Sequence, residues 1–444
     1  MFCVISRYFT FQRIFFLVVG LWPYQQSRLV QFQLNLCSGL QISFIIFQLS
    51  VFITAECTLD FVIKVLSFVL LLTIYAIEYN SFRINAQAVK YSLEQLQLIY
   101  NELTDENEIA IIKKYGNNAK RLTITIIILY ICGSIIVGSI TILPYILNLA
   151  LHINVTQPRV MKQLMPEYFT EQESHFYLIL LYMDIVLFIG ATTFLASETM
   201  FVSYFIHICG IFSIASYRIE KAIIINIDQE KRIDYENEII IYKKIIYAVD
   251  IHRKAIKLSS FLMRSFKKSR FFLIIINVVC LSLNLYAVAV NTSNEDHVVE
   301  QLLIHFLIIL IVLIYLFFIN YVGQEIMNHN DHVFSTVYNT QWYIAPLHVQ
   351  KLILFLLQRG IKTVSLNFGG VILLSLEFFA TVKIINYACY INIYNNNDTA
   401  RIKNYKTYLI TANAGIVILF YCYVFYAKII FNNLLYECMQ EFEM

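Results

Sequence analysis

Three side chains that could bind a metal ion lie in one polar segment of an otherwise apolar chain. Glu325, His329 and His332 stand at positions i, i+4 and i+7, which places them on one face of a helix. Carboxylate and imidazole groups are ligands of Zn²⁺. The sequence places no further ligand beside them, and three such residues in a polar helix more often form a solvated face. We therefore expect no metal site here.

The rest of the chain shows no pattern for catalysis. It has no glycine-rich phosphate loop, no Gly-x-Ser-x-Gly elbow and no Cys/His nucleophile pattern. The nine cysteines occur singly, without a Cys-x-x-Cys pair, so they indicate neither a zinc site nor a disulfide framework. The net charge of +3 is small. We expect no enzyme activity, no cofactor and no nucleic-acid partner.

Two ionisable residues, Glu377 and Lys383, lie inside an apolar run. Charged side chains are costly in a bilayer and usually face protein or water rather than lipid. A water-filled pore would supply such surroundings, and so would pairing with neighbouring helices. The sequence leaves both interpretations open.

The composition predicts a membrane protein with many spans. Of the 444 residues, 59% are hydrophobic and 14% are charged, whereas soluble domains are about 45–50% apolar. About 20 apolar residues cross a bilayer core as a helix. Runs of about this length lie at 34–55, 61–78, 122–146, 176–206, 271–290, 302–322, 366–390 and 408–430. We predict an all-α fold with seven spans and a questionable eighth, preceded by an interfacial segment over residues 14–22.

The basic residues predict the orientation. Cytoplasmic loops of membrane proteins are enriched in Lys and Arg. Of the 33 basic residues, 25 lie in the segments 1–33, 79–121, 207–270 and 323–363. The N-terminus is therefore expected in the cytoplasm. Asn-x-Ser/Thr glycosylation sequons at Asn154, Asn291 and Asn397 all fall on the opposite side, which agrees.

This topology disfavours a G-protein-coupled receptor. A cytoplasmic N-terminus and seven spans place the end of span seven outside the cell, the inverse of that class. Spans six and seven also contain no proline, although receptors of that class kink both. A transporter is disfavoured because nothing indicates the broken helices that transporters use.

The polar segment 323–343 follows span six on the predicted cytoplasmic side. Ile326, Val333, Val337 and Trp342 recur in it at roughly helical spacing, which predicts an amphipathic helix outside the lipid. Such an apolar stripe needs a partner, either the region 207–270 or another subunit.

Several short motifs occur in order along the chain. In one of them, a glycine is followed at fixed offsets by a tyrosine, a Trp-Tyr pair and a proline. The motif residues are Gly323, Tyr338, Trp342, Tyr343 and Pro346; Gly20 to Pro23; Leu143-Pro144-Tyr145; His207, Cys209, Gly210 and Phe212; Tyr217 to Ile219; and Leu366 with Gly369. Together they resemble the insect odorant receptor family, and the Gly-Leu-Trp-Pro form is typical of hymenopteran members. Glu198 stands where relatives often have aspartate, and Asn330 stands where many have serine.

The resemblance implies an odorant-tuned subunit of a ligand-gated, non-selective cation channel, or alternatively a gustatory-type chemoreceptor channel. It implies a heterotetramer with an odorant receptor co-receptor in the plasma membrane of olfactory dendrites. The motif from Gly323 to Pro346 would then anchor subunit to subunit. Span seven would line the pore, with its constriction register open between Asn386-Tyr387 and Cys389-Tyr390. The expected pore residues are Glu377, Lys383, Tyr387, Cys389, Tyr390 and Ile393.

Relatives bind small volatile odorants in the outer half of the bundle. Under the predicted topology this selects apolar and aromatic residues with a few hydroxyl groups, which suit such ligands. For each residue alone, core packing or lipid contact is the alternative. The expected ligand-binding residues are Phe61, Val65, Phe68, Pro144, Tyr145, Tyr177, Met183, Leu281, Tyr286 and Phe306.

These assignments divide the chain into five predicted regions. The regions are an N-terminal arm (1–33), a ligand-binding bundle (34–322), a cytoplasmic anchor (323–363), a pore helix (364–394) and a C-terminal extension (395–444). The C-terminal extension departs from the family, whose members end soon after span seven. It is either a genuine eighth helix or an extension introduced by the coding model.

Overall fold

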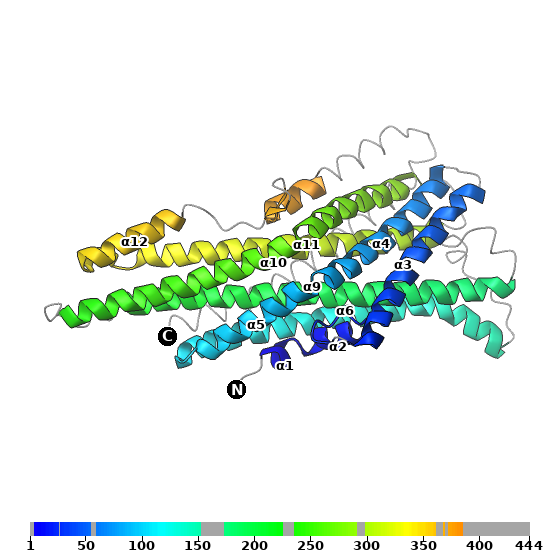
Figure 1. The fold of residues 1–444 in the computed structure, drawn as a ribbon. Helices are drawn as coiled ribbons and strands as arrows, with labels where there is room; N and C mark the ends of the chain where they lie inside the picture. The colour runs from blue at the N-terminus through cyan, green and yellow to red at the C-terminus, as the bar shows by residue number, and fades with distance from the viewer. Residues whose placement is uncertain are drawn as a thin grey trace.

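The computed structural model describes residues 4–25, 27–54, 59–151, 173–224, 235–290, 298–360, 367–368 and 372–384. This part of the chain is helical apart from short connections and one pair of two-residue strands (Figure 1). A further helical stretch covers residues 376–384. The elements are α1 (Val4–Tyr8), α2 (Thr10–Val18), α3 (Arg28–Thr54), α4 (Leu59–Ile84), α5 (Ala86–Glu102), α6 (Glu106–Leu151), α9 (Glu173–Ile224), α10 (Tyr235–Val290), α11 (Val298–Asn339), η2 (Trp342–Ile344), α12 (Leu347–Gly360), β1 (Asn367–Phe368) and β2 (Ile372–Leu373).

Six helices of the described part are long and apolar enough to cross a membrane. They are α3, α4, α6, α9, α10 and α11, and each holds one of the first six predicted spans. These predictions are confirmed. Of the seventh run, only residues 367–368 and 372–384 are described, and the run 408–430 lies outside the described residues.

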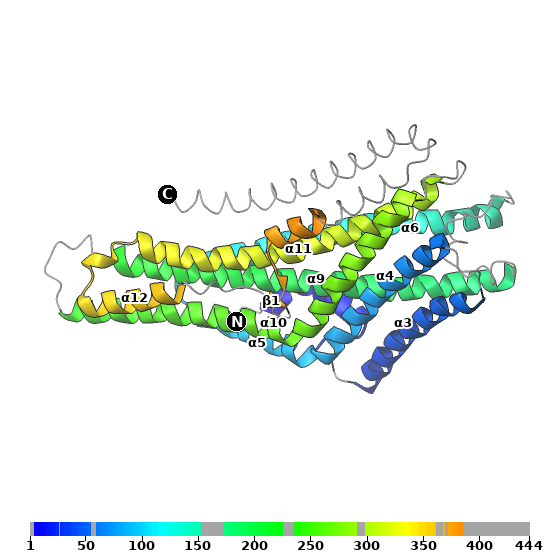
Figure 2. The ribbon, with the colours of Figure 1, turned by 90° about the horizontal axis from the view of Figure 1, so that it is seen from above.

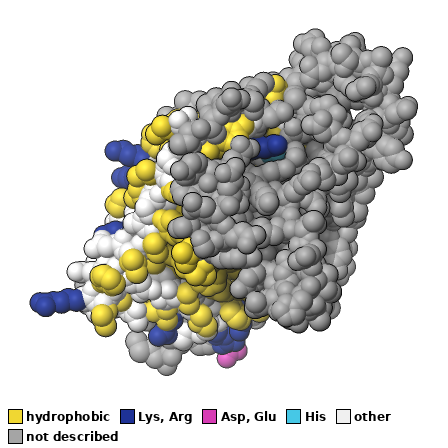
Figure 3. Space-filling model, turned by 90° about the vertical axis from the view of Figure 1, so that its right-hand side faces the viewer, with side chains coloured by type: hydrophobic (Ala, Val, Ile, Leu, Met, Phe, Trp, Pro, Cys, Tyr) yellow, Lys and Arg dark blue, Asp and Glu magenta, His cyan; other side chains and the backbone are white. Residues whose placement is uncertain are grey.

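The long helices extend well beyond a bilayer. The 56 residues of α10 span about 84 Å at 1.5 Å per residue, compared with a hydrocarbon core of about 30 Å. At one end of the molecule, α5, α12 and the first part of α10 lie beside the N-terminus (Figures 1 and 2). This is the end that carries most of the Lys and Arg residues. Seen from the opposite end, hydrophobic side chains make up much of the described surface (Figure 3).

Helix α9 forms the centre of the bundle. It packs against α2, α3, α4, α6, α10 and α11. Every residue from Thr199 to Phe212 is buried, so the buried positions go round the whole helix. A helix that is apolar on every side belongs in an interior, which explains why the other helices surround α9.

Ion pairs join the helices at the basic end of the bundle. Arg218 of α9 donates from Nε to Glu108 Oε1 of α6 over 2.6 Å, and Lys221 Nζ lies 2.7 Å from Asp105 Oδ2. The hydrogen bond from Lys221 lowers the pKa of Asp105, so this pair stays charged at neutral pH. These contacts fix the start of α6 beside the end of α9.

The polar segment after span six is the direct continuation of α11. Ile326, Val333 and Val337 are completely buried, and this confirms the predicted amphipathic helix for these three residues. Trp342 does not continue that helix, because α11 ends at Asn339 and Trp342 begins the short turn η2. The indole packs against the core from this turn and is only partly buried.

Candidate functional site

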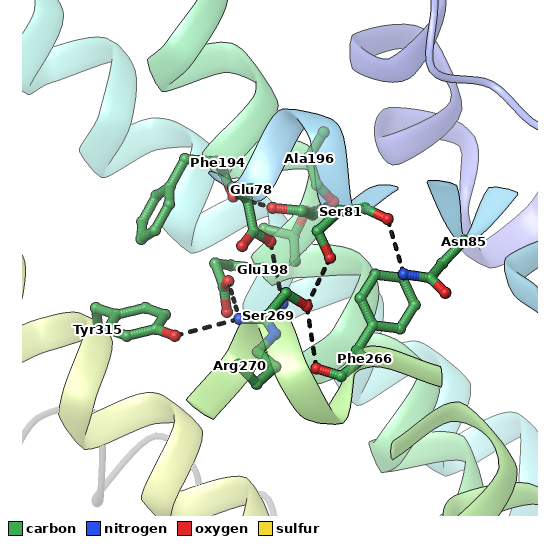
Figure 4. Close-up of polar contacts among 12 residues, drawn as sticks. Glu78, Ser81, Asn85, Phe194, Ala196, Glu198, Phe266, Ser269, Arg270 and Tyr315 are labelled. Atoms are coloured by element: carbon green, nitrogen blue, oxygen red, sulfur yellow. Dashed lines mark hydrogen bonds and ion pairs between the residues drawn. The ribbon is translucent and has the colours of Figure 1, made fainter. Parts of the chain in front are cut away.

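A buried arginine joins four helices in the bundle (Figure 4). Arg270 of α10 forms ion pairs with Glu78 of α4, at 3.1 Å, and with Glu198 of α9. Its Nη1 also donates a hydrogen bond to the hydroxyl of Tyr315 on α11 over 3.3 Å. The side chains of Arg270 and Glu78 are 3% and 1% exposed, so the contact between them is excluded from water.

Further contacts hold the Arg270 network in place. The guanidinium lies 4.1 Å from the ring centroid of Phe201, a cation–π distance. Beside it, Ser81 of α4 donates a hydrogen bond to Ser269 of α10 over 2.7 Å. Removing one partner of a buried ion pair leaves an uncompensated charge, which is strongly destabilising. The network therefore fixes α4, α9, α10 and α11 relative to one another.

Sequence reasoning missed most of this network. Glu198 was noted only for its place in the family pattern, and Glu78 and Arg270 were not singled out. A usable signal was their position at the end of the run 61–78 and just before the run 271–290, since ionisable groups at such places need partners. Their pairing could not be read from spacing, because 192 and 72 residues separate Arg270 from its two partners.

Four of the predicted ligand-binding residues fall into two apolar clusters. Phe68 and Met183 are buried together where α3, α4 and α9 meet. Leu281 and Phe306 belong to another cluster, where α10 and α11 meet the helical residues 376–384. Among the described side chains these two clusters are separate, so the structure brings the predicted residues together only in part.

The other predicted ligand-binding residues vary in exposure. Val65 is buried, Tyr286 is half-buried, and the ring of Phe61 lies 6.1 Å from that of Phe52. Three residues have side chains outside the described part, although their backbones belong to α6 or α9: Pro144, Tyr145 and Tyr177.

A polar pair near the second cluster was not anticipated. His305 Nδ1 of α11 and Asn284 Oδ1 of α10 are 2.9 Å apart, and both side chains are buried. Asn284 Nδ2 also donates to the carbonyl of Cys280 over 2.8 Å. The pair places hydrogen-bonding groups among otherwise apolar side chains in the predicted outer half of the bundle.

The start of span seven has two distinct faces. Phe379 and Val382 are buried against α11 and its neighbours. On the opposite face, Glu377, Thr381 and Ile384 are exposed in the single chain, while Lys383 lies at the edge and is half-buried. The remaining predicted pore residues lie outside the described part: Tyr387, Cys389, Tyr390 and Ile393.

Gly323 allows two segments to approach closely. A Cβ atom at this position would lie 2.7 Å from the carbonyl oxygen of Leu374, just before the helical residues 376–384. Asn320, one turn earlier on α11, accepts a hydrogen bond from the backbone N–H of Ser375 over 3.1 Å. Gly323 thus contributes by positioning the start of span seven within the chain.

The other predicted anchor residues point outward or lie near the surface. Tyr338 and Tyr343 are 71% and 63% exposed, and Pro346 is half-buried. Phe355 and Leu347 of α12, which were not selected individually from the sequence, are 71% and 67% exposed. We call the exposed apolar surface of α11, η2 and α12 the anchor patch; it comprises Tyr338, Tyr343, Ile344, Leu347, Leu354 and Phe355.

The Glu325, His329 and His332 group is engaged in contacts within the protein. His329 Nε2 lies 2.9 Å from the hydroxyl of Tyr115, and its Nδ1 lies 2.9 Å from the carbonyl of Glu325. His332 Nδ1 lies 3.3 Å from Ser216 Oγ. Within the described part of the chain, no group of three or more His, Cys, Asp or Glu residues is arranged to hold a metal ion. The three predicted glycosylation sites, Asn154, Asn291 and Asn397, lie outside the described residues.

Comparison with known proteins identifies the family. Residues 58–386 match the family model of the 7tm odorant receptors. This chain belongs to the odorant receptor family. The receptor is therefore a polytopic membrane protein and not an enzyme, as its sequence predicts. No curated protein sequence matches it.

Two solved structures share the fold of this receptor. Both are of the insect olfactory receptor OR5 from Machilis hrabei, one of them in complex with eugenol. The complex is 16% identical over 89% of this chain and all of the other chain, with a TM-score of 0.69. The structure described without eugenol is 15% identical over 88% and 99% of the two chains, again with a TM-score of 0.69. At these identities the comparison establishes the fold.

Proposed function

We propose that this receptor is the odorant-tuned subunit of a heteromeric, ligand-gated, non-selective cation channel. Its partners are an odorant receptor co-receptor in a heterotetramer, a small volatile hydrophobic odorant and the lipid bilayer. Its location is the plasma membrane of olfactory sensory neuron dendrites, with the N-terminus in the cytoplasm. Membership of the odorant receptor family and the fold shared with OR5 support this proposal.

The observation that carries the channel proposal is the exposed face of residues 376–384. Glu377 and Thr381 lie on it, inside an apolar run. A carboxylate that faced lipid there would be costly, so such a group faces water or protein. This face, together with the corresponding faces of the partner subunits around a central axis, would give a water-filled path with an acidic group in its wall, which suits cations.

The anchor patch supports assembly. Tyr338 and Phe355 are exposed in the single chain, yet they lie beyond the apolar part of α11 and therefore outside the lipid. Exposed apolar side chains gathered on neighbouring elements favour protein contacts, and aromatic residues are enriched in interfaces. The co-receptor is the partner that the family membership suggests.

The ligand is proposed to bind in the outer half of the bundle. The two apolar clusters there supply the hydrophobic lining that a small volatile molecule requires. The OR5 structure with eugenol supports a ligand of this kind, because eugenol is a small molecule bound by a protein of the same fold.

Cysteine accessibility tests the pore. We expect Thr381→Cys, recorded with the co-receptor in a cell line, to be blocked by a thiol-reactive cation. Val382→Cys is the matched control. Val382 is the next residue along the chain, but its side chain is buried against α11, so a cysteine there should not react. Equal behaviour of the two variants, with normal surface expression of both, would remove the pore assignment of this helix.

A further inference from the structure

A cavity of about 320 Å³ lies where the N-terminal arm meets α3, α4 and α5. Its size is at the lower end of the roughly 300–1,000 Å³ that is typical of small-molecule sites. Amide side chains, one guanidinium and one indole supply most of its polar lining, and the residues that carry the argument are Trp22, Gln25, Gln31, Arg83 and Gln87.

One wall of the cavity is a fixed turn. Gly20 has a φ of 77°, a conformation that glycine adopts without strain, and its position is packed against Gln33. Gln33 Nε2 donates a hydrogen bond to the carbonyl of Val18 over 2.7 Å, and the hydroxyl of Tyr79 donates to the carbonyl of Val19 over 3.0 Å. Side chains of α3 and α4 thus hold the turn in place, so the cavity is preformed.

The surroundings of the cavity are basic. Residues 1–55 and 79–93, which include every lining residue, contain no Asp or Glu. Arg83 donates from Nη2 to Asn35 Oδ1 over 2.6 Å and forms no ion pair with a described side chain. The remaining donors of this guanidinium therefore favour an anion in the cavity.

The cavity lies beside the ends of the apolar runs of α3 and α4, the level at which the membrane surface is expected. The ring of Trp22 lies 5.5 Å from that of Tyr24, and Lys90 Nζ lies 5.4 Å from the Tyr24 centroid. Trp and Tyr are enriched at the membrane–water interface. The apolar run of α3 begins at Leu34, and that of α4 ends shortly before Arg83. Both boundaries are on the lysine- and arginine-rich side of the protein.

We propose that this cavity binds an anionic organic phosphate, with Arg83 as its main ligand. The interfacial level favours the headgroup of a phospholipid as the source, because the leaflet on the basic side of membrane proteins is the one that carries anionic lipids. A bound headgroup would join the N-terminal arm to α4 and α5, and so link the lipid surface to the bundle. The site is independent of the odorant-binding and pore residues.

Native mass spectrometry of the purified full-length receptor tests this proposal. The delipidated protein is incubated with equal amounts of phosphatidylserine, which is anionic, and phosphatidylcholine, which is neutral overall. We expect preferential retention of phosphatidylserine. Arg83→Gln should weaken it about fivefold, since one Arg near an anionic surface contributes roughly 1 kcal/mol. Arg253→Gln, at an exposed position of α10 outside the cavity, should leave it unchanged.

A second variant tests the cavity without changing its charge. Ala86 lines the cavity, and Ala86→Leu should fill part of it and also weaken retention, so the test does not depend on one substitution. Glycerol 3-phosphate as a competitor distinguishes the sources: it displaces the lipid only if the phosphate alone is sufficient, which would assign the site to a soluble phosphate. Equal retention of both lipids, or unchanged retention in both cavity variants, would overturn the proposal.

Discussion

Replacing Arg270 with glutamine should be among the most damaging single changes in this receptor. The substitution leaves the carboxylates of Glu78 and Glu198 inside the bundle without the cation that both contact. Removing one partner from a buried ion pair costs about 3–5 kcal/mol, and here two like charges are left together. The helices α4, α9, α10 and α11 all meet at this point, so a cost of that size should lower the stability of the whole bundle.

The numbers of acidic and basic groups in the Arg270 network predict different costs for different substitutions. Two carboxylates share one guanidinium, so Glu198→Gln leaves a balanced pair of Arg270 with Glu78. We therefore expect Glu198→Gln to cost much less than Arg270→Gln. Combining Arg270→Gln with Glu78→Gln and Glu198→Gln should recover a large part of the loss, because no uncompensated charge then remains.

Thermal unfolding of the purified receptor, followed by intrinsic fluorescence, measures these effects. Arg264→Gln is the matched control, since Arg264 is on the same helix but exposed. Arg270→Gln should melt several degrees lower than Arg264→Gln, because each kcal/mol moves the melting temperature by about 2–4 °C in chains of 150–250 residues. Equal melting temperatures for the two variants, or no recovery in the triple variant, would refute the argument from buried charge.

Two other predictions concern the arrangement of span seven and the anchor patch. Gly323→Val should cost about 1–3 kcal/mol of unfolding free energy, the usual range for overpacking, because the new side chain would meet Leu374. Gly133→Val should have little effect in the same thermal assay, because a Cβ atom at Gly133 would meet nothing within 4 Å beyond its own stretch of helix. Phe355→Ser should reduce co-purification with the co-receptor while leaving the free energy of unfolding of the single chain within about 0.5 kcal/mol of wild type, as is usual for exposed positions. Normal co-purification of Phe355→Ser together with Tyr338→Ser would mean that the anchor patch does not contact the partner.

The sequence by itself determined the class of protein and the elements of its fold. Apolar runs long enough to cross a bilayer reflect local composition, so they locate α3, α4, α6, α9, α10 and α11 without knowledge of their neighbours. The helical spacing of Ile326, Val333 and Val337 likewise predicted the buried face of the extended α11, because periodicity within one helix is a local property. The family motifs identified the receptor correctly, although each motif is short.

Only the tertiary structure decided which distant groups meet. Arg270 pairs with Glu78, which is 192 residues away in the sequence. The N-terminal arm, α3, α4 and α5 together line the basic cavity. Gly323 lies against Leu374, which belongs to the next segment of the chain. The same holds for Trp342, whose place in a helical pattern gave no sign that α11 ends at Asn339. Hydrophobic periodicity fixes which face of a helix is buried, but it contains no information on the neighbour that buries it, because apolar contacts are not directional. The partners of these residues follow from the packing of whole helices around α9.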